Sequence, residues 1–219
     1  MKDLILGFKL LKYSYRCRTN VIMLVVITAI GLYMEIISKG TQMLGGFYFM
    51  LTGMFAYQMM VYMDASDYVQ SSIMKRKLQV VIPVMLSTFV YAVIFTLLIV
   101  EKLILIKVYP ENASIICNSL FQIEILLFLS MIFCGACYKY FFVSFIVFMV
   151  VALTTISRMS SALMVRDVTE LLGIGLGGLA VVGYVFIILG GIAEYILSSA
   201  LYKKDLSELA MNGLIKSLK

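Results

Sequence analysis

Carboxyl groups that interrupt apolar stretches are the side chains of this sequence best placed to do chemistry. Glu124 and Glu194 each lie within a run of otherwise apolar residues. A charge at membrane depth is costly, and such residues usually face a bundle interior or a water-filled cavity. Both glutamates are therefore candidates for the path of a cationic cargo. The alternatives are structural. Glu194, nine residues before Lys203, would lie near the cytoplasmic interface in an ion pair, and Glu124 would be hydrated near the outer start of its span.

Two short motifs match signatures of soluble proteins but lie in the wrong setting. The run from Gly173 to Gly178 fits G-x-G-x-x-G, yet it opens an apolar run where a dinucleotide loop would follow a strand. We favour close helix packing through Gly173 and Gly177 instead. Cys134 and Cys137 form a C-x-x-C pair, but the sequence has no histidine and no second ligand pair for zinc. We expect both cysteines to pack as small apolar residues, with no metal bound.

The sequence offers no arrangement for catalysis. It contains no G-x-x-x-x-G-K-[ST] loop for ATP and, without histidine, no serine–histidine pair. No two aspartates fall within the apolar segments, which excludes an intramembrane aspartic protease. We expect that this chain is not an enzyme by itself and carries no cofactor of its own.

Composition places the chain in a membrane. Of its 219 residues 63% are hydrophobic and only 14% are charged, with a mean hydropathy of +1.03. Soluble domains are about half apolar and about a quarter charged. Because a membrane-crossing helix needs about 20 apolar residues, we predict one all-α membrane domain over residues 1–219 with about six spans.

The elements of this domain follow from the apolar runs. The predicted spans cover residues 21–38, 46–63, 79–100, 119–137, 141–156 and 173–200, and residues 203–219 form a cytoplasmic tail. Residues 3–16 form an amphipathic helix at the membrane interface, with Leu4, Phe8, Leu11 and Tyr15 on its apolar face. We expect a loop with some helical extension over 101–118, a minimal turn at 138–140, and short helices at the membrane surface over 157–170.

The distribution of cations orients the domain. With six spans, thirteen of the 18 lysines and arginines fall on the side of the N-terminus. The other five are Lys39, Lys102, Lys107, Arg158 and Arg166. Cytoplasmic loops of membrane proteins carry the excess of positive charge. We therefore expect an integral protein of the plasma membrane with both termini in the cytoplasm. The same asymmetry explains the net charge of +6 without nucleic acid.

The segment 64–83 is the longest polar interruption between two strongly apolar segments. It begins with Asp64 and Asp67, continues through two serines and the apolar pair Ile73 and Met74, and ends in a cluster of cations. We interpret it as a cytoplasmic loop with a short helix that docks onto a partner protein. The contact residues of this docking helix would be Val69, Gln70, Ser71, Ser72, Ile73, Met74 and Lys75.

This layout resembles the permease subunit of type-2 ABC exporters. The run from Ser71 to Gln79, followed by Ile82 and Pro83, is similar to the loop of small Firmicute-type permeases, which have serine, a basic cluster, Leu-Gln and then Ile-Pro. Such loops often have a proline after the serines, where this chain has Ile73. The resemblance implies a connecting helix at 3–16, a coupling helix at 64–78 and re-entrant helices before the sixth span.

The resemblance also implies a function. A separate cytosolic ATPase subunit, with its own ATP and Mg²⁺, would power a dimer of two permease chains, and the cargo would be an amphipathic or hydrophobic peptide, in toxin export or peptide-antibiotic immunity. Two alternatives remain open. One is a non-transporting membrane scaffold or immunity protein, which needs no ATPase. The other is a membrane enzyme, which would need polar side chains clustered at one membrane face.

Overall fold

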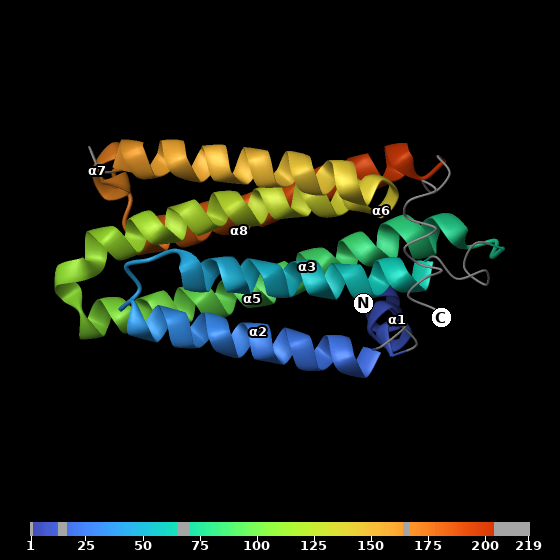
Figure 1. Cartoon of the computed structure of the whole chain (residues 1–219), viewed down its shortest axis with the longest axis horizontal. Coiled ribbons are helices and arrows are strands. Elements are labelled where there is room, and N and C mark those ends of the chain that lie inside the picture. The colour runs from blue at the N-terminus through green and yellow to red at the C-terminus, as the bar shows by residue number, and fades with distance from the viewer. Residues whose placement is uncertain (1, 13–16, 65–70, 164–166, 204–219) are drawn as a thin grey trace.

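The chain folds entirely into helices over the residues that the structure describes. The computed structural model describes residues 2–12, 17–64, 71–163 and 167–203, and contains no strand within them (Figure 1). In chain order the elements are α1 (Lys2–Leu11), α2 (Cys17–Ile37), α3 (Leu44–Asp64), the π-helical turn η1 (Lys77–Val81), α5 (Ile82–Val108), the 3-10 turn η2 (Pro110–Asn112), α6 (Ala113–Leu163), α7 (Val168–Leu172) and α8 (Leu176–Leu201). The predicted all-α class is confirmed.

Four helical segments of the described chain are long and apolar enough to cross a membrane. They are Cys17–Ile37, Lys77–Val108, Pro110–Cys137 and Leu176–Leu201, and they include most of the predicted spans 21–38, 79–100, 119–137 and 173–200. The other two predicted spans coincide with shorter apolar helices, Leu44–Met54 and Val143–Met159. Transmembrane character is therefore a property of the fold, while six crossings stay a prediction.

The predicted loop at 101–118 is wrong, because most of it is helical. α5 continues through Glu101 and Lys102 to Val108, and α6 begins already at Ala113. Only Tyr109 and η2 separate the two helices. Tyr109 has a non-helical backbone, with φ −128° and ψ 70°, directly before Pro110. A residue before proline avoids the helical conformation, so Pro110 accounts for the end of α5.

The predicted turn at 138–140 is confirmed in position. Tyr140 has φ −129° and ψ 57° inside α6, and the chain reverses direction there (Figure 1). α6 is therefore a hairpin of two antiparallel halves. Its second half runs to Leu163, and α7 follows at Val168. Residues 157–163 thus extend a long helix, and only the short α7 remains of the separate surface helices expected over 157–170.

The bundle core lies where α3, α5, α6 and α8 meet. Its large buried side chains include Phe49, Tyr91, Phe95, Leu98 and Leu120. Glycines bring the helices close together at two places. A methyl group added at Gly183 of α8 would collide with the ring of Phe95, and one added at Gly135 of α6 would lie 2.9 Å from the Glu194 Cα.

The predicted packing motif at Gly173 and Gly177 does not join helices within the described chain. An added Cβ meets nothing within 4 Å at either position. Gly173 instead has φ +63° and ends α7, a backbone conformation that glycine adopts readily. The glycines of α8 that pack closely against other helices are Gly183, Gly190 and Gly191.

Both ends of the bundle have a distinct set of elements. At one end lie α1, η1, the reversal of α6 and the end of α8 (Figure 1). At the opposite end lie the turn between α2 and α3, η2 and α7. We call these the α1 end and the α7 end.

Candidate functional site

The described part of the predicted partner-docking segment forms a short, hydrogen-bonded turn. The Ser72 Oγ accepts a hydrogen bond from the Met74 backbone N–H at 3.1 Å, and the Ser72 carbonyl accepts one from the Lys75 N–H at 3.0 Å. The Met74 carbonyl then accepts the Leu78 N–H at 3.0 Å, which joins the turn to η1. A tight turn over 71–74 therefore leads into helical residues from Lys75. Val69 and Gln70 lie outside the described residues.

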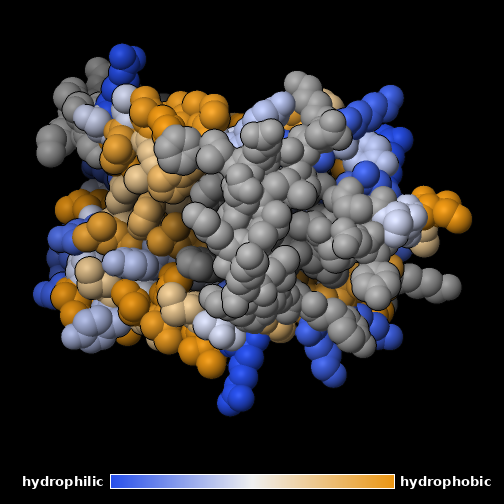
Figure 2. All heavy atoms as spheres, turned by 45° about the vertical axis from the view of Figure 1, so that its right-hand side comes forward, coloured by the Kyte–Doolittle hydropathy of each residue, from blue (hydrophilic) through white to orange (hydrophobic). Residues whose placement is uncertain are grey.

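This turn presents two apolar side chains to its surroundings. Ile73 is fully exposed, at 106% of its reference surface, and Met74 is 49% exposed. Lys75, Arg76 and Lys77 follow directly. Hydrophilic side chains project from the α1 end, beside hydrophobic ones (Figure 2). An isoleucine that makes so little contact with its own chain is available for a contact with another molecule.

α1 packs against the first turns of the following helical segment. Ile82 and Leu86 are buried beneath Leu6, Leu10 and Leu11. The Asp3 carboxylate lies 2.7 Å from the Lys77 ammonium, and the rings of Phe8 and Phe89 meet edge to face at 5.8 Å. α1 is thus tied to η1 and α5 by apolar, ionic and aromatic contacts.

The face of α1 that packs on α5 overlaps the predicted face only in part. Leu11 belongs to both and Phe8 meets Phe89, whereas Leu6 and Leu10, on the adjoining side of the helix, complete the contact with Ile82 and Leu86. Phe8 stays 44% exposed. Tyr15 lies outside the described residues, and the helix is described only to Leu11. The sequence signal for the inward face was the Leu6–Leu10 pair at helical spacing.

Between the turn at 71–74 and α5 lies one π-helical turn. The Ile82 N–H bonds the Lys77 carbonyl, five residues back, and Gln79 and Val80 are buried within the turn. π-helical turns insert one extra residue into a helix and are frequent at functional sites. η1 follows the exposed turn at 71–74 and leads directly into α5, and its Lys77 contacts Asp3 of α1.

Glu194 is fully buried among α5, α6 and α8. Its two carboxyl oxygens lie 2.7 and 2.8 Å from the Ser87 Oγ. Within the described residues Glu194 is in no ion pair, so the ion pair considered for it is absent there. The nearby groove of about 320 Å³ is lined by apolar residues of α5 and α8 such as Met85 and Ile192, and Glu194 does not line it.

Glu124 is also fully buried, in the first half of α6. Neither of its carboxyl oxygens has a hydrogen-bond partner among the described residues. This burial does not fit the hydrated alternative. Glu124 and Glu194 belong to no group of three acidic or cysteine side chains able to hold a metal within the described chain. A role for either on a cargo path stays a prediction.

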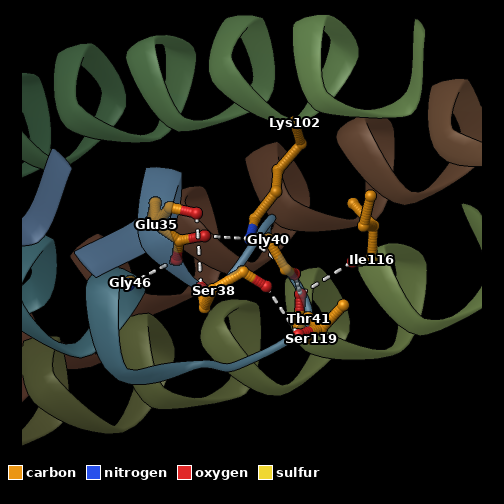
Figure 3. A network of polar contacts seen from close by, with 8 residues as sticks. All are labelled: Glu35, Ser38, Gly40, Thr41, Gly46, Lys102, Ile116 and Ser119. Carbon is orange, nitrogen blue, oxygen red and sulfur yellow. Dashed lines mark hydrogen bonds and ion pairs between the residues drawn. The ribbon is translucent and has the colours of Figure 1, made fainter. Parts of the chain in front are cut away.

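The structure reveals a buried ion pair that the sequence did not predict. The Lys102 ammonium lies 2.6 Å from Glu35 Oε2, and both side chains are completely buried (Figure 3). Lys102 also donates to the Gly40 carbonyl at 3.2 Å, and the Gly46 N–H donates to Glu35 Oε1 at 2.9 Å. The Ser119 hydroxyl donates to the same Gly40 carbonyl at 3.1 Å. This network joins α2, α3, α5 and α6 at the α7 end.

A second polar contact closes the same end. The Asn118 amide donates to Asp167 Oδ1 at 2.8 Å and accepts the Val168 N–H at 2.8 Å. These bonds hold the start of α7 against the start of α6. The α7 end is therefore held by buried polar bonds. By contrast, the described contacts of α1 are mainly apolar and partly exposed.

No protein-family model, curated protein or solved structure matches the chain.

Proposed function

We propose that the chain is the transmembrane subunit of an ATP-driven ABC exporter. The observation that carries the proposal is the docking turn, where Ile73 stands fully exposed next to a cluster of cations. The turn continues through η1 directly into α5, a helix of the bundle core. A partner that holds Ile73 and Met74 could therefore move a transmembrane helix.

The charges of the described residues support an orientation for this subunit. The α1 end carries the cations Lys9, Lys12, Arg18, Lys75, Arg76, Lys77 and Lys203, and the acids Asp3 and Asp64. The α7 end carries the acids Glu111, Asp167 and Glu170 and the cations Lys39, Lys107 and Arg158. The α1 end then faces the cytoplasm, by the excess of positive charge. The six crossings in this proposal are α2, α3, η1 with α5, the two halves of α6, and α8. An even number of crossings puts both termini on the cytoplasmic side of the plasma membrane.

ATP hydrolysis belongs to a separate cytosolic subunit, which supplies the ATP site and Mg²⁺. Closure of two such ATPases pulls the docking turn, and η1 transmits the displacement to α5 and, through Lys77 and Asp3, to α1. α1 acts as the connecting helix and α7 as part of the re-entrant segment. This chain contributes no catalytic residue of its own.

The transport path lies between two copies of the chain. Amphipathic or hydrophobic peptides are the cargo class, because the predicted spans are rich in methionine and phenylalanine, with 16 and 14 of them in the chain. Methionine side chains adapt to varied apolar partners. Glu124 and Glu194 would contact cationic groups of the cargo only after the helices that bury them separate.

The proposal is tested by the ATPase activity that accompanies the purified chain. The tagged protein is purified in detergent from its own host, and vanadate-sensitive ATP hydrolysis is measured in the eluate. We expect activity with the wild type, its loss with Ile73→Asp or Met74→Asp, and its retention with Ile73→Leu. The apolar contact explains this pattern, because leucine preserves the side-chain volume whereas aspartate places a charge in the interface.

A matched control lies at the other end of the molecule. Leu172 of α7 is exposed to the same extent as Met74, at 49%, so Leu172→Asp should leave the associated ATPase activity unchanged. If the wild type purifies without ATP hydrolysis and the substitutions at Ile73 change nothing, the exporter proposal fails. The protein would then be a non-transporting membrane scaffold or immunity protein.

A further inference from the structure

Glu194 has fewer hydrogen-bond donors around it than a buried, ionised carboxylate needs. The Ser87 Oγ lies 2.7 Å from Glu194 Oε1, 2.8 Å from Glu194 Oε2 and 3.0 Å from the Val84 carbonyl oxygen. All three are acceptors when Glu194 is ionised, and a serine hydroxyl has a single proton to donate. An ionised Glu194 would therefore compete with Val84 for that one proton.

A proton on Glu194 removes this competition. The carboxylic acid O–H then donates to the Ser87 Oγ, whose lone pairs accept it, and the Ser87 O–H donates to the Val84 carbonyl. Both hydroxyl protons have an acceptor, and no net charge is buried. A burial this complete otherwise requires a counterion or several donors, because an unpaired charge in an apolar interior is very costly.

Glu194 forms no ion pair within the described residues. Tyr91 of α5 and Cys134 and Cys137 of α6 lie near it, and none of them carries positive charge. Lys139, one turn after Gly135 on α6, is not paired with Glu194, and Lys77 of η1 is paired with Asp3. The hydrogen-bond partner of Glu194 in the described chain is therefore a hydroxyl group and not a cation.

Glu194 is completely buried and its partner Ser87 is only 1% exposed, and beside them the backbones of α6 and α8 approach closely. A methyl group added at Gly135 would lie 2.9 Å from the Glu194 Cα and 3.0 Å from its carbonyl oxygen. The Ser198 hydroxyl, one turn later on α8, reaches the Gly135 carbonyl at 3.4 Å. Here α6 and α8 are in backbone contact.

From this geometry we propose that Glu194 is a proton-binding site inside the bundle, occupied in the packed state described here. The proton is bound to Glu194 and hydrogen-bonded to the Ser87 Oγ, and its release requires α8 to separate from α5 and α6 so that water or a cation can reach the carboxylate. Proton binding and helix packing are thereby coupled. This inference stands on the bundle interior and does not depend on an ATPase partner.

Infrared spectroscopy of the protein in liposomes tests the proposal directly. An ordinary glutamate has a pKa of about 4.3 and is ionised near neutral pH, so it contributes no carboxylic acid C=O band there. We expect the difference spectrum of wild type minus Glu194→Gln, recorded near neutral pH, to contain a carboxylic acid band that shifts in D₂O. The matched control Glu111→Gln, at an exposed site in η2, should leave this spectral region unchanged.

Ser87→Ala provides a second readout that does not require the Glu194 variant to fold. Loss of the hydroxyl acceptor should shift the acid band to higher frequency, because the Glu194 O–H is no longer hydrogen-bonded. The proposal is overturned if Glu194→Gln removes carboxylate bands and no acid band. It is equally overturned if the acid region of folded Ser87→Ala is identical to that of the wild type.

Discussion

Three buried carboxyl groups show three ways of placing a glutamate inside an apolar bundle. Glu35 is paired with Lys102 and also accepts a backbone N–H. Glu194 has a serine hydroxyl as its partner, and Glu124 has no partner among the described residues. Glu35 and Lys102 are both charged because each compensates the other. Removing one member of this pair should therefore cost more folding free energy than removing Glu194 or Glu124.

Lys102→Met should strongly destabilise the protein. The substitution preserves most of the side-chain volume but leaves Glu35 buried without its cation, and breaking a buried pair costs about 3–5 kcal/mol. Thermal unfolding in detergent, followed by circular dichroism, measures the effect. The double variant Glu35→Gln/Lys102→Met should recover most of the lost stability, because no charge is left unpaired.

Lys107→Met is the matched control for this pair. Lys107 is exposed in the last turn of the same helix, so its loss should change the unfolding temperature little. Equal destabilisation by Lys102→Met and Lys107→Met would contradict the structural role of the ion pair.

At the scale of elements, α1 and η1 form one packed unit whose stability depends on the inward face of α1. Leu10→Asp should release α1, because aspartate cannot replace the apolar contact with Ile82 and Leu86. The loss is below the roughly 1.5–3 kcal/mol of a complete leucine burial, since Leu10 is only partly buried. Hydrogen–deuterium exchange of the α1 amides should accelerate.

Ile5→Asp is the control within the same helix, since Ile5 is 48% exposed. It should leave amide exchange in α1 and η1 close to that of the wild type. If both substitutions accelerate exchange alike, the packing of α1 on α5 is not what orders it.

α8 also offers a test of how closely its neighbours pack. Gly183→Ala places a methyl group against the Phe95 ring and should destabilise by about 1–3 kcal/mol, the usual cost of overpacking. Gly177→Ala, where nothing lies within 4 Å, should be neutral or slightly stabilising because alanine favours the helix. Unfolding temperatures of the two variants in detergent decide this. A larger loss for Gly177→Ala would restore the packing role predicted for Gly173 and Gly177.

At the scale of the whole molecule, the proposed orientation predicts which residues are reached from each side of the membrane. In a variant without native cysteines, Ile73→Cys should react with a membrane-impermeant thiol reagent only after the cells are opened. Lys107→Cys, at the α7 end, should react in intact cells. The reverse pattern would invert the topology, and labelling of both residues from one side would exclude an odd number of crossings between them.

The sequence predicted the elements of this fold better than their contacts. Apolar runs located four long helices, and the short break at 138–140 located the reversal at Tyr140. The end of the helix after residue 100 was missed because Glu101 and Lys102 read as the start of a loop. Lys102 remains helical and buried because its partner Glu35 lies 67 residues earlier in the chain, and such a partner is not visible in local hydropathy.

For the candidate site, too, the sequence indicated single residues but not their contacts. Ile73 and Met74 are exposed, as a docking surface requires, and their docking role stays a prediction. The contact of Leu6 and Leu10 with α5 was missed because apolar residues lie around much of α1, and the sequence alone does not say which of them meet protein. The serine partner of Glu194 was equally hidden, since Ser87 lies 107 residues away on another helix.

The polar network at the α7 end gives α5 the mechanics of a lever. Lys102 is held near one end of the helix, and η1 with the docking turn extends from the other. The 20 residues of α5 between Ile82 and Lys102 span about 30 Å, so a tilt of about 5° around this fulcrum would displace the start of α5 by about 2.6 Å. A modest push at Ile73 would therefore change the helix spacing most at the α1 end and least beside Lys102.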